Sequence, residues 1–283
     1  MGNALYIYAT KLSYKGLLAT AYVGPIPLAS SIFFKILLTC YRKHKYGEFW
    51  NKSRSNFINE DNTIKKVNFW PLLVNIYANC AHYTFFTLAF KYAKLAGINQ
   101  GVVTIMVIMA TIFNSISFYF AFGEKPSCTK IIGICFSASI TIFLGINGVL
   151  QDDSDLKVKN ADGDSSRTAY SFYSLGFATL VPIGFSLKHF FIRKFKGSYN
   201  SFDLVMDSSI GENAVFCIVS IYQATNGGFN TTELLYGGAS GVLRNFGNQF
   251  MGIGISFGQG AAGQALMTTN SLWLTFFTVI FDG

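Results

Sequence analysis

The stretch LAGINQGVVTIMVIMATIFNSISFYFAFG (residues 95–123) contains no Asp, Glu, Lys or Arg. A helix of about 20 consecutive apolar residues is long enough to cross the hydrocarbon core of a bilayer, and this stretch is longer. Further uncharged stretches occupy residues 67–90, 131–151, 168–187 and 245–281. The sequence therefore predicts an all-α chain, a polytopic bundle of transmembrane helices.

The composition of the 283 residues supports this class. Charged residues make up 13% of the chain, against about 25% in an ordinary soluble domain. The net charge of +8 comes from Lys and Arg in short gaps between apolar stretches, so no basic face for nucleic acid is expected. The cysteines are scattered without C-x-x-C spacing, which argues against a disulfide framework or a metal site; they are Cys40, Cys80, Cys128, Cys135 and Cys217.

The number of predicted helices is eight. Two further spans cover residues 17–40 and 202–223, which carry only a few charged residues. The uncharged stretch at 245–281 is too long for a single span of about 20 residues. Its glycine-rich middle supplies a turn, so we divide the region into helices at 233–256 and 259–281.

The distribution of positive charge predicts the orientation of these helices. The gaps at residues 42–66, 124–130 and 188–202 together hold thirteen Lys and Arg, and the gaps on the other side hold seven. Cytosolic loops carry the excess of Lys and Arg, so the first three gaps are predicted to be cytosolic. The acidic segment 151–167 is then a non-cytosolic linker. An endomembrane and the plasma membrane both fit this integral, multi-pass topology.

The two halves of the chain look related. Gln100-Gly101 and Gln259-Gly260 each open a long apolar stretch, at an offset of 159 residues, and four of 25 positions are identical there. Each half also shows the same order of a polar gap, a span, a polar loop, a second span, a Gln-Gly turn and a third span. An odd number of spans per half predicts two inverted repeats.

Three segments in this region resemble the EamA-type repeat of the drug/metabolite transporter superfamily. They are AGINQG (residues 96–101) before a long apolar helix, the turn FGEKPS (residues 122–127), and IIG (residues 131–133) before another apolar run. The resemblance implies two five-helix repeats, both chain ends in the cytosol, and transport of a small solute without a cofactor.

By this resemblance, residues 1–150 form the first repeat, 151–167 the linker and 168–283 the second repeat. Ten helices are expected, so most of the first helix and the last helix are missing from this sequence. The chain is then either a fragment or a shortened member of the family.

Two charged residues lie deep inside predicted spans. Arg244 lies about ten residues into its span, which is roughly 15 Å at 1.5 Å per residue, and Glu212 reaches a similar depth from the opposite side. Charges within a bilayer are costly and face a partner or a cavity. A substrate or proton site and a structural ion pair are equally compatible with this pair. Arg244 also suits an anionic substrate, such as those of nucleotide-sugar and phosphate-ester exchangers, but the substrate stays open.

Polar uncharged residues add further candidates. Asn245, Asn248 and Gln249 share one helix face, which could bind either a polar solute or neighbouring helices. By the family resemblance, Asn114 and Asn270 line a central cavity. His82, a lone histidine within a span, is a further substrate-binding candidate, with a structural role as the favoured alternative. Snorkelling or mutual pairing explains Lys35 and Asp207.

These observations predict a secondary transporter that moves a small organic metabolite by alternating access around a midplane site. No catalytic or metal-ligating constellation is present, so we expect neither an enzyme nor a cofactor. The predicted partners are the lipid bilayer, a small-molecule solute and either a proton or a counter-substrate, with a homodimer left open and no nucleic acid. The rival interpretation is a non-transporting membrane scaffold or a degenerate transporter fragment.

The orientation predicts which of two glycosylation sequons is used. Asn230-Thr231-Thr232 lies in a gap without positive charge, whereas Asn51-Lys52-Ser53 lies in the most basic gap. We expect a glycan on Asn230 and none on Asn51, measured as glycosidase-sensitive mass that disappears in Asn230→Gln. Mass that survives Asn230→Gln and disappears in Asn51→Gln would reverse the orientation.

Overall fold

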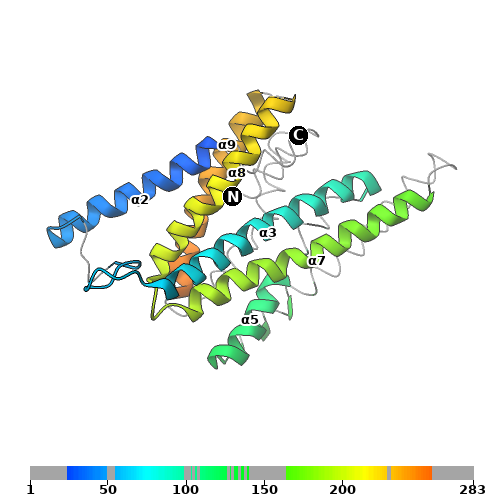
Figure 1. Ribbon diagram of the computed structural model, residues 1–283. Helices are drawn as coiled ribbons and strands as arrows, with labels where there is room; N and C mark the ends of the chain where they lie inside the picture. The colour runs from blue at the N-terminus through cyan, green and yellow to red at the C-terminus, as the bar shows by residue number, and fades with distance from the viewer. Residues whose placement is uncertain are drawn as a thin grey trace. The chain divides into compact units, whose positions relative to one another are not determined.

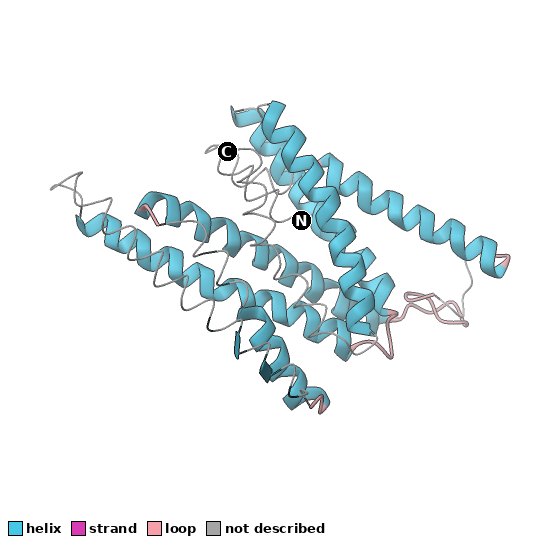
Figure 2. Cartoon of the chain, turned by 180° about the vertical axis from the view of Figure 1, so that it is seen from behind, coloured by secondary structure: helices cyan, strands magenta, loops and turns pink. Residues whose placement is uncertain are grey.

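The computed structural model describes residues 24–49, 55–98, 109–125, 164–227 and 231–256, together with single residues between 103 and 139. This part of the chain is built from helices, and a long loop joins α2 to α3 (Figure 2). Its β-pairing is one isolated bridge in the loop before α3. The predicted all-α class is confirmed.

Six helices are described (Figure 1), and four of them, α3, α7, α8 and α9, confirm predicted helices in position. The predicted helix at 259–281, most of the one at 131–151 and the residues Asn51, Asn230 and Asn270 lie outside the described residues. The bounds are α2 (Pro25–Tyr46), α3 (Lys66–Ala96), α5 (Met109–Phe122), α7 (Asp164–Lys194), α8 (Ser201–Gly227) and α9 (Thr231–Ser256).

Helix α2 differs at both ends from the predicted span at 17–40. It begins at Pro25, whose fixed φ and missing N–H suit the first position of a helix. It continues through the basic residues that we assigned to a loop, because cations in the last turn interact favourably with the helix dipole. It ends at Gly47, which has a φ of 78° and donates its N–H to the carbonyl of Lys43 at 2.7 Å.

Two more glycines end helices in the same way. Gly97, with a φ of 74°, follows α3, so Leu95 belongs to α3 and not to the helix predicted at 95–123. Gly123, with a φ of 66°, follows α5 and donates its N–H to the carbonyl of Tyr119 at 3.0 Å. Left-handed glycines are the usual residues after a helix C-terminus, and the predicted turn at Glu124 lies there.

Two of the described helical segments are long and apolar enough to cross a bilayer, namely Thr168–Lys194 in α7 and Ser201–Tyr222 in α8. A shorter apolar segment, Ile112–Phe122, lies in α5. Eight membrane helices and the inverted repeats therefore remain predictions.

The chain divides into two compact units, and each draws segments from both halves of the sequence. Unit 1 consists of Met1–Cys80, Phe191–Gln259 and Trp273–Gly283, and it contains α2, α8, α9 and the first half of α3. Unit 2 consists of Ala81–Phe190 and Gly260–Leu272, and it contains the second half of α3, α5 and most of α7.

In unit 1, helices α2, α8 and α9 pack against one another, and α8 and α9 run side by side (Figure 1). Small residues permit the close approach. A Cβ on Gly241 of α9 would overlap the ring of Pro27, and a Cβ on Gly252 would lie 2.5 Å from a methyl group of Val205 on α8. The backbone N–H of Gly24 donates to the hydroxyl of Ser220 at 3.0 Å.

In unit 2, the second half of α3 packs against α7. A Cβ on Gly184 would lie 3.4 Å from the Cα of His82, and the hydroxyl of Ser174 donates to the carbonyl of Ala89 at 3.0 Å. Helix α5 contacts α7 through a hydrogen bond, in which the hydroxyl of Ser186 on α7 donates to the carbonyl of Ala110 on α5 at 3.3 Å. Small and hydroxyl residues at such contacts are typical of helices packed in lipid.

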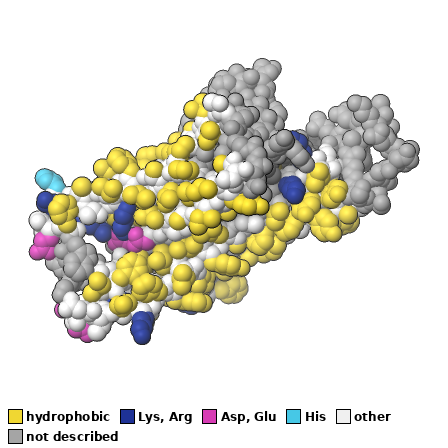
Figure 3. Space-filling view, turned by 45° about the horizontal axis from the view of Figure 1, so that its top comes forward, with side chains coloured by type: hydrophobic (Ala, Val, Ile, Leu, Met, Phe, Trp, Pro, Cys, Tyr) yellow, Lys and Arg dark blue, Asp and Glu magenta, His cyan; other side chains and the backbone are white. Residues whose placement is uncertain are grey.

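Many polar side chains of the described helices are buried, and many of their large apolar side chains are exposed. On α9, Phe250 is 70% exposed and Asn248 is 2% exposed; on α8, Ile218 is 70% exposed and Glu212 is 0% exposed. Most of the described side chains on the face drawn in Figure 3 are hydrophobic. In soluble proteins, buried polar groups and large exposed apolar patches are the exception.

The contact between Gly241 and Pro27 is testable by one added methyl group. We expect Gly241→Ala to lower the thermal unfolding midpoint in detergent, since overpacking a rigid contact costs about 1–3 kcal/mol. Gly247 is the control, because it lies on the same helix with nothing within 4 Å of an added Cβ. Gly247→Ala should raise the midpoint, as alanine favours a helix by about 1 kcal/mol over glycine. Equal midpoints for the two variants would contradict the contact.

Candidate functional site

The structure brings together the two charged residues found inside predicted spans. A guanidinium nitrogen of Arg244 on α9 lies 3.4 Å from Oε1 of Glu212 on α8, and both side chains are buried in unit 1. The same nitrogen donates a hydrogen bond to Oδ1 of Asn213. Neither oxygen of Glu212 accepts a hydrogen bond from any residue in the described ranges. Arg244 and Glu212 thus form an ion pair that leaves the carboxylate lone pairs open.

Asn245, the next candidate on α9, ties this helix to α2. Its amide nitrogen, which carries two hydrogens, lies within hydrogen-bond distance of three acceptors: the carbonyl of Pro27 at 2.9 Å and the hydroxyls of Ser30 at 2.7 Å and Ser31 at 3.0 Å. Its oxygen accepts from Asn213 at 3.2 Å. These bonds engage both the nitrogen and the oxygen of the amide, so we interpret Asn245 as a structural residue that holds α9 to α2.

Other buried polar side chains lie on the helical segments that carry the pair, or on the segment of α3 whose Ile76 contacts the position of Gly211, and they lack hydrogen-bond partners among the described residues. Both amide atoms of Asn248 and of Asn75 are in this state. The thiol of Cys80 on α3 interacts electrostatically with both Glu212 and Arg244. The segment of α3 around Cys80 therefore lies near the ion pair. We call the set the Glu212 cluster; it consists of Asn75, Asn79, Ser209, Glu212, Arg244, Asn248 and Gln249.

The members of the cluster on α3 were missed by the sequence analysis. The prediction of a span at residues 67–90 rests on the absence of charged residues. The uncharged amides of Asn75 and Asn79 do not alter it. A signal was nevertheless present, because Asn75, Asn79 and His82 follow i, i+4, i+7 spacing, which is one face of a helix. Asn213 was also missed, although it follows Glu212 directly.

The candidates His82 and Asn114 lie in unit 2. Nδ1 of His82 lies 3.0 Å from the carbonyl oxygen of Val181. The amide nitrogen of Asn114 lies 3.0 Å from Nδ1 of His189, and the ring of Phe185 contacts both imidazoles. His189 was missed because we placed it in a cytosolic gap. The structure gives both candidates protein partners within their own unit, so we interpret them as structural.

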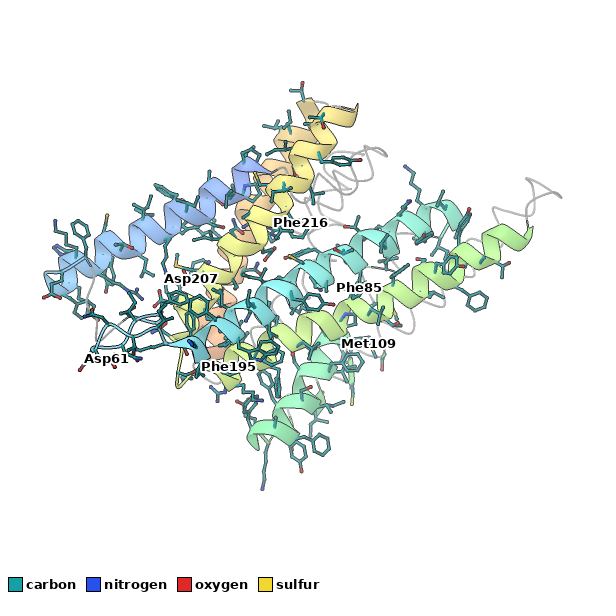
Figure 4. The ribbon with its side chains drawn as sticks, in the orientation of Figure 1. Asp61, Phe85, Met109, Phe195, Asp207 and Phe216 are labelled. Carbon is teal, nitrogen blue, oxygen red and sulfur yellow. The ribbon has the colours of Figure 1, made fainter. Side chains whose placement is uncertain are left out.

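Lys35 and Asp207 pair with each other at 2.7 Å, which confirms the mutual pairing considered from the sequence. Lys35 also contacts Asp203 at 3.2 Å, and Arg42 contacts Asp203 at 2.7 Å. The hydroxyl of Tyr199 donates to Asp207, labelled in Figure 4, at 2.7 Å. Burial and the nearby charge of Asp207 raise the pKa of Tyr199. This Lys35 cluster joins α2 to α8 with its charges mutually satisfied.

Among the residues that the structure describes, no group of three or more His, Cys, Asp or Glu side chains could hold a metal ion. No family model, curated protein or solved structure matches the chain. The EamA-type resemblance therefore rests on the sequence segments at residues 96–101, 122–127 and 131–133 alone.

The geometry around Glu212 predicts a rescue experiment. Arg244→Ala should lower the yield of folded protein, because removing one partner of a buried pair leaves an uncompensated charge and costs about 3–5 kcal/mol. The double variant Arg244→Ala/Glu212→Gln should recover most of that yield, measured by size-exclusion chromatography in detergent.

The matched control is Lys45→Ala, which removes an exposed cation near the end of α2 and should leave the yield unchanged. If Arg244→Ala folds as well as Lys45→Ala, Arg244 is not required to compensate Glu212.

Proposed function

We propose that this chain is a multi-pass membrane transporter of the EamA type, which moves a small polar solute by alternating access around the Glu212 cluster. The proposal combines the sequence resemblance with the buried polar cluster of unit 1. Its membrane is an endomembrane or the plasma membrane, and its helices are arranged as inverted repeats.

The membrane setting is supported by the distribution of side chains. Large apolar residues such as Phe250 and Ile218 are exposed, while Asn and Glu on the same helices are buried. Lipid tails are as apolar as leucine, so exposed apolar side chains carry no penalty in a bilayer. Two described helical segments also meet the length and apolarity of a membrane span.

The observation that carries the transport proposal is the set of unsatisfied polar atoms in the Glu212 cluster. Buried polar side chains in proteins nearly always have hydrogen-bond partners, and leaving one unpaired costs about 1–3 kcal/mol. In the described chain, two side-chain polar atoms have no hydrogen-bond partner in each of Glu212, Asn75 and Asn248. Hydrogen bonds to a solute or to water would offset this cost.

The ion pair supports the same interpretation. Arg244 is held by Asn213 and lies 3.4 Å from Glu212 without hydrogen-bond geometry. A purely structural pair gains most from short, bidentate hydrogen bonds. The longer separation leaves Glu212 able to accept hydrogen bonds from a solute while Arg244 still balances its charge.

Alternating access is testable without knowing the solute. In a background with the five native cysteines replaced by alanine, Asn248→Cys should react with a membrane-impermeant methanethiosulfonate reagent. It should do so both in right-side-out and in inside-out vesicles, because a site that opens to each side meets water from each side. Phe250→Cys is the control, since Phe250 lies two residues away on the exposed apolar face.

We expect Asn248→Cys to react at least about tenfold faster than Phe250→Cys in both vesicle types, because the reagent attacks the thiolate, which forms in water. Labelling from one side only would exclude alternating access. Labelling from neither side would favour the non-transporting scaffold.

A further inference from the structure

We infer that the solute bound by the Glu212 cluster carries no net charge and no phosphate, and that it offers both hydrogen-bond donors and acceptors. Polyols, sugars and nucleosides belong to this class. The inference rests on the proposed transport function and goes beyond it by naming the class of solute. It also differs from the sequence-based suggestion that Arg244 serves an anionic substrate.

The charge balance of the cluster is the first step. Glu212 carries one negative charge and Arg244 one positive charge, and they lie 3.4 Å apart. The pair is therefore neutral as a unit. A phosphate ester would bring about two negative charges into a site whose single cation already has a carboxylate beside it and Asn213 as a hydrogen-bond acceptor. Buried charges without an opposite partner are strongly disfavoured.

Three other cations in the described part of unit 1 have partners of their own. Lys35 and Arg42 pair with Asp203 and Asp207, so the Lys35 cluster is balanced. Arg193 donates to the carbonyl of Ile255, eleven residues beyond Arg244 on α9, which is about 16 Å along the helix. Within the described ranges of unit 1, the ion pair given for Glu212 is the one with Arg244.

The open polar atoms of the cluster are of both kinds. Glu212 and Gln249 offer oxygens that accept, Asn79 offers an amide nitrogen that donates, and Asn75 and Asn248 offer one of each. A carboxamide presents a donor and an acceptor side by side. Hydroxyl groups and the edges of nucleobases present matching donors and acceptors, whereas a phosphate presents acceptors alone at its ionised oxygens.

The test compares pairs of compounds that differ only by a phosphate group: uridine and uridine monophosphate, glucose and glucose 6-phosphate, glycerol and glycerol 3-phosphate. Each is added at millimolar concentration to the full chain in detergent, and the thermal unfolding midpoint is measured. A ligand that binds only the folded state raises the midpoint. We expect at least one neutral compound to raise it by about 2 °C or more, and its phosphate to leave it unchanged.

Two variants locate the effect. Asn248→Leu, which replaces both open amide atoms by an apolar group of similar size, should abolish the shift. Thr225→Val is the control, because the Thr225 hydroxyl bonds only to its own helix at the carbonyl of Tyr222 and the side chain is exposed; it should keep the shift.

A phosphate that raises the midpoint as much as its neutral partner overturns the inference, as does a panel in which no neutral compound raises it, or a shift that survives Asn248→Leu. These results leave the transport proposal standing if Asn248→Cys is still labelled from both sides of the membrane. Loss of that labelling removes the proposed function itself.

Discussion

The buried carboxylate of Glu212 is the constraint on which the rest of unit 1 depends. A charged side chain at this depth requires a nearby opposite charge, and Arg244 supplies it from the neighbouring helix at 3.4 Å. Arg244 in turn needs a fixed position, which Asn213 provides by accepting a hydrogen bond from its guanidinium group. Asn213 then binds Ser31 and Asn245, so the chain of contacts reaches α2. One continuous set of polar contacts, which begins at Glu212, therefore links three helices.

Close helix packing makes this network geometrically feasible. The distances require that α9 approach both α2 and α8, and glycines allow it: Gly241 faces Pro27, and Gly252 faces Val205. On α3, Ile76 contacts the position of Gly211, directly before Glu212 on α8. Small residues therefore serve two purposes, because they gain van der Waals contact between helices and bring polar side chains of different helices within reach. The unsatisfied amides at Asn75 and Asn248 lie on two of these tightly packed helices.

Much of the helical layout could be predicted from the sequence, because length and apolarity of a segment are local properties. Helices α3, α7, α8 and α9 lie where apolar stretches with few or no charged residues predicted spans. The ends of the helices were harder to predict. Basic residues that suggested a loop after residue 40 belong to α2, since their charges favour the helix C-terminus. The candidate site was only partly predictable: Arg244, Glu212, Asn248 and Gln249 stand out as polar residues in apolar surroundings, but Asn75 and Asn79 on α3 were hidden in a span judged by charge alone.

The sequence by itself determined the all-α class, the approximate helix positions and the candidacy of polar residues within apolar segments, because each depends on residues that are neighbours along the chain. Only the tertiary structure decided which of these residues meet. In the structure, Glu212 forms an ion pair with Arg244. The amide of Asn245 bonds to Ser30 and Ser31 on α2, and the amide of Asn114 lies against the imidazole of His189. Those partners are separated by 32 (244 − 212) to 215 residues along the chain, and the pairing of distant side chains is set by how helices pack, which no local pattern specifies.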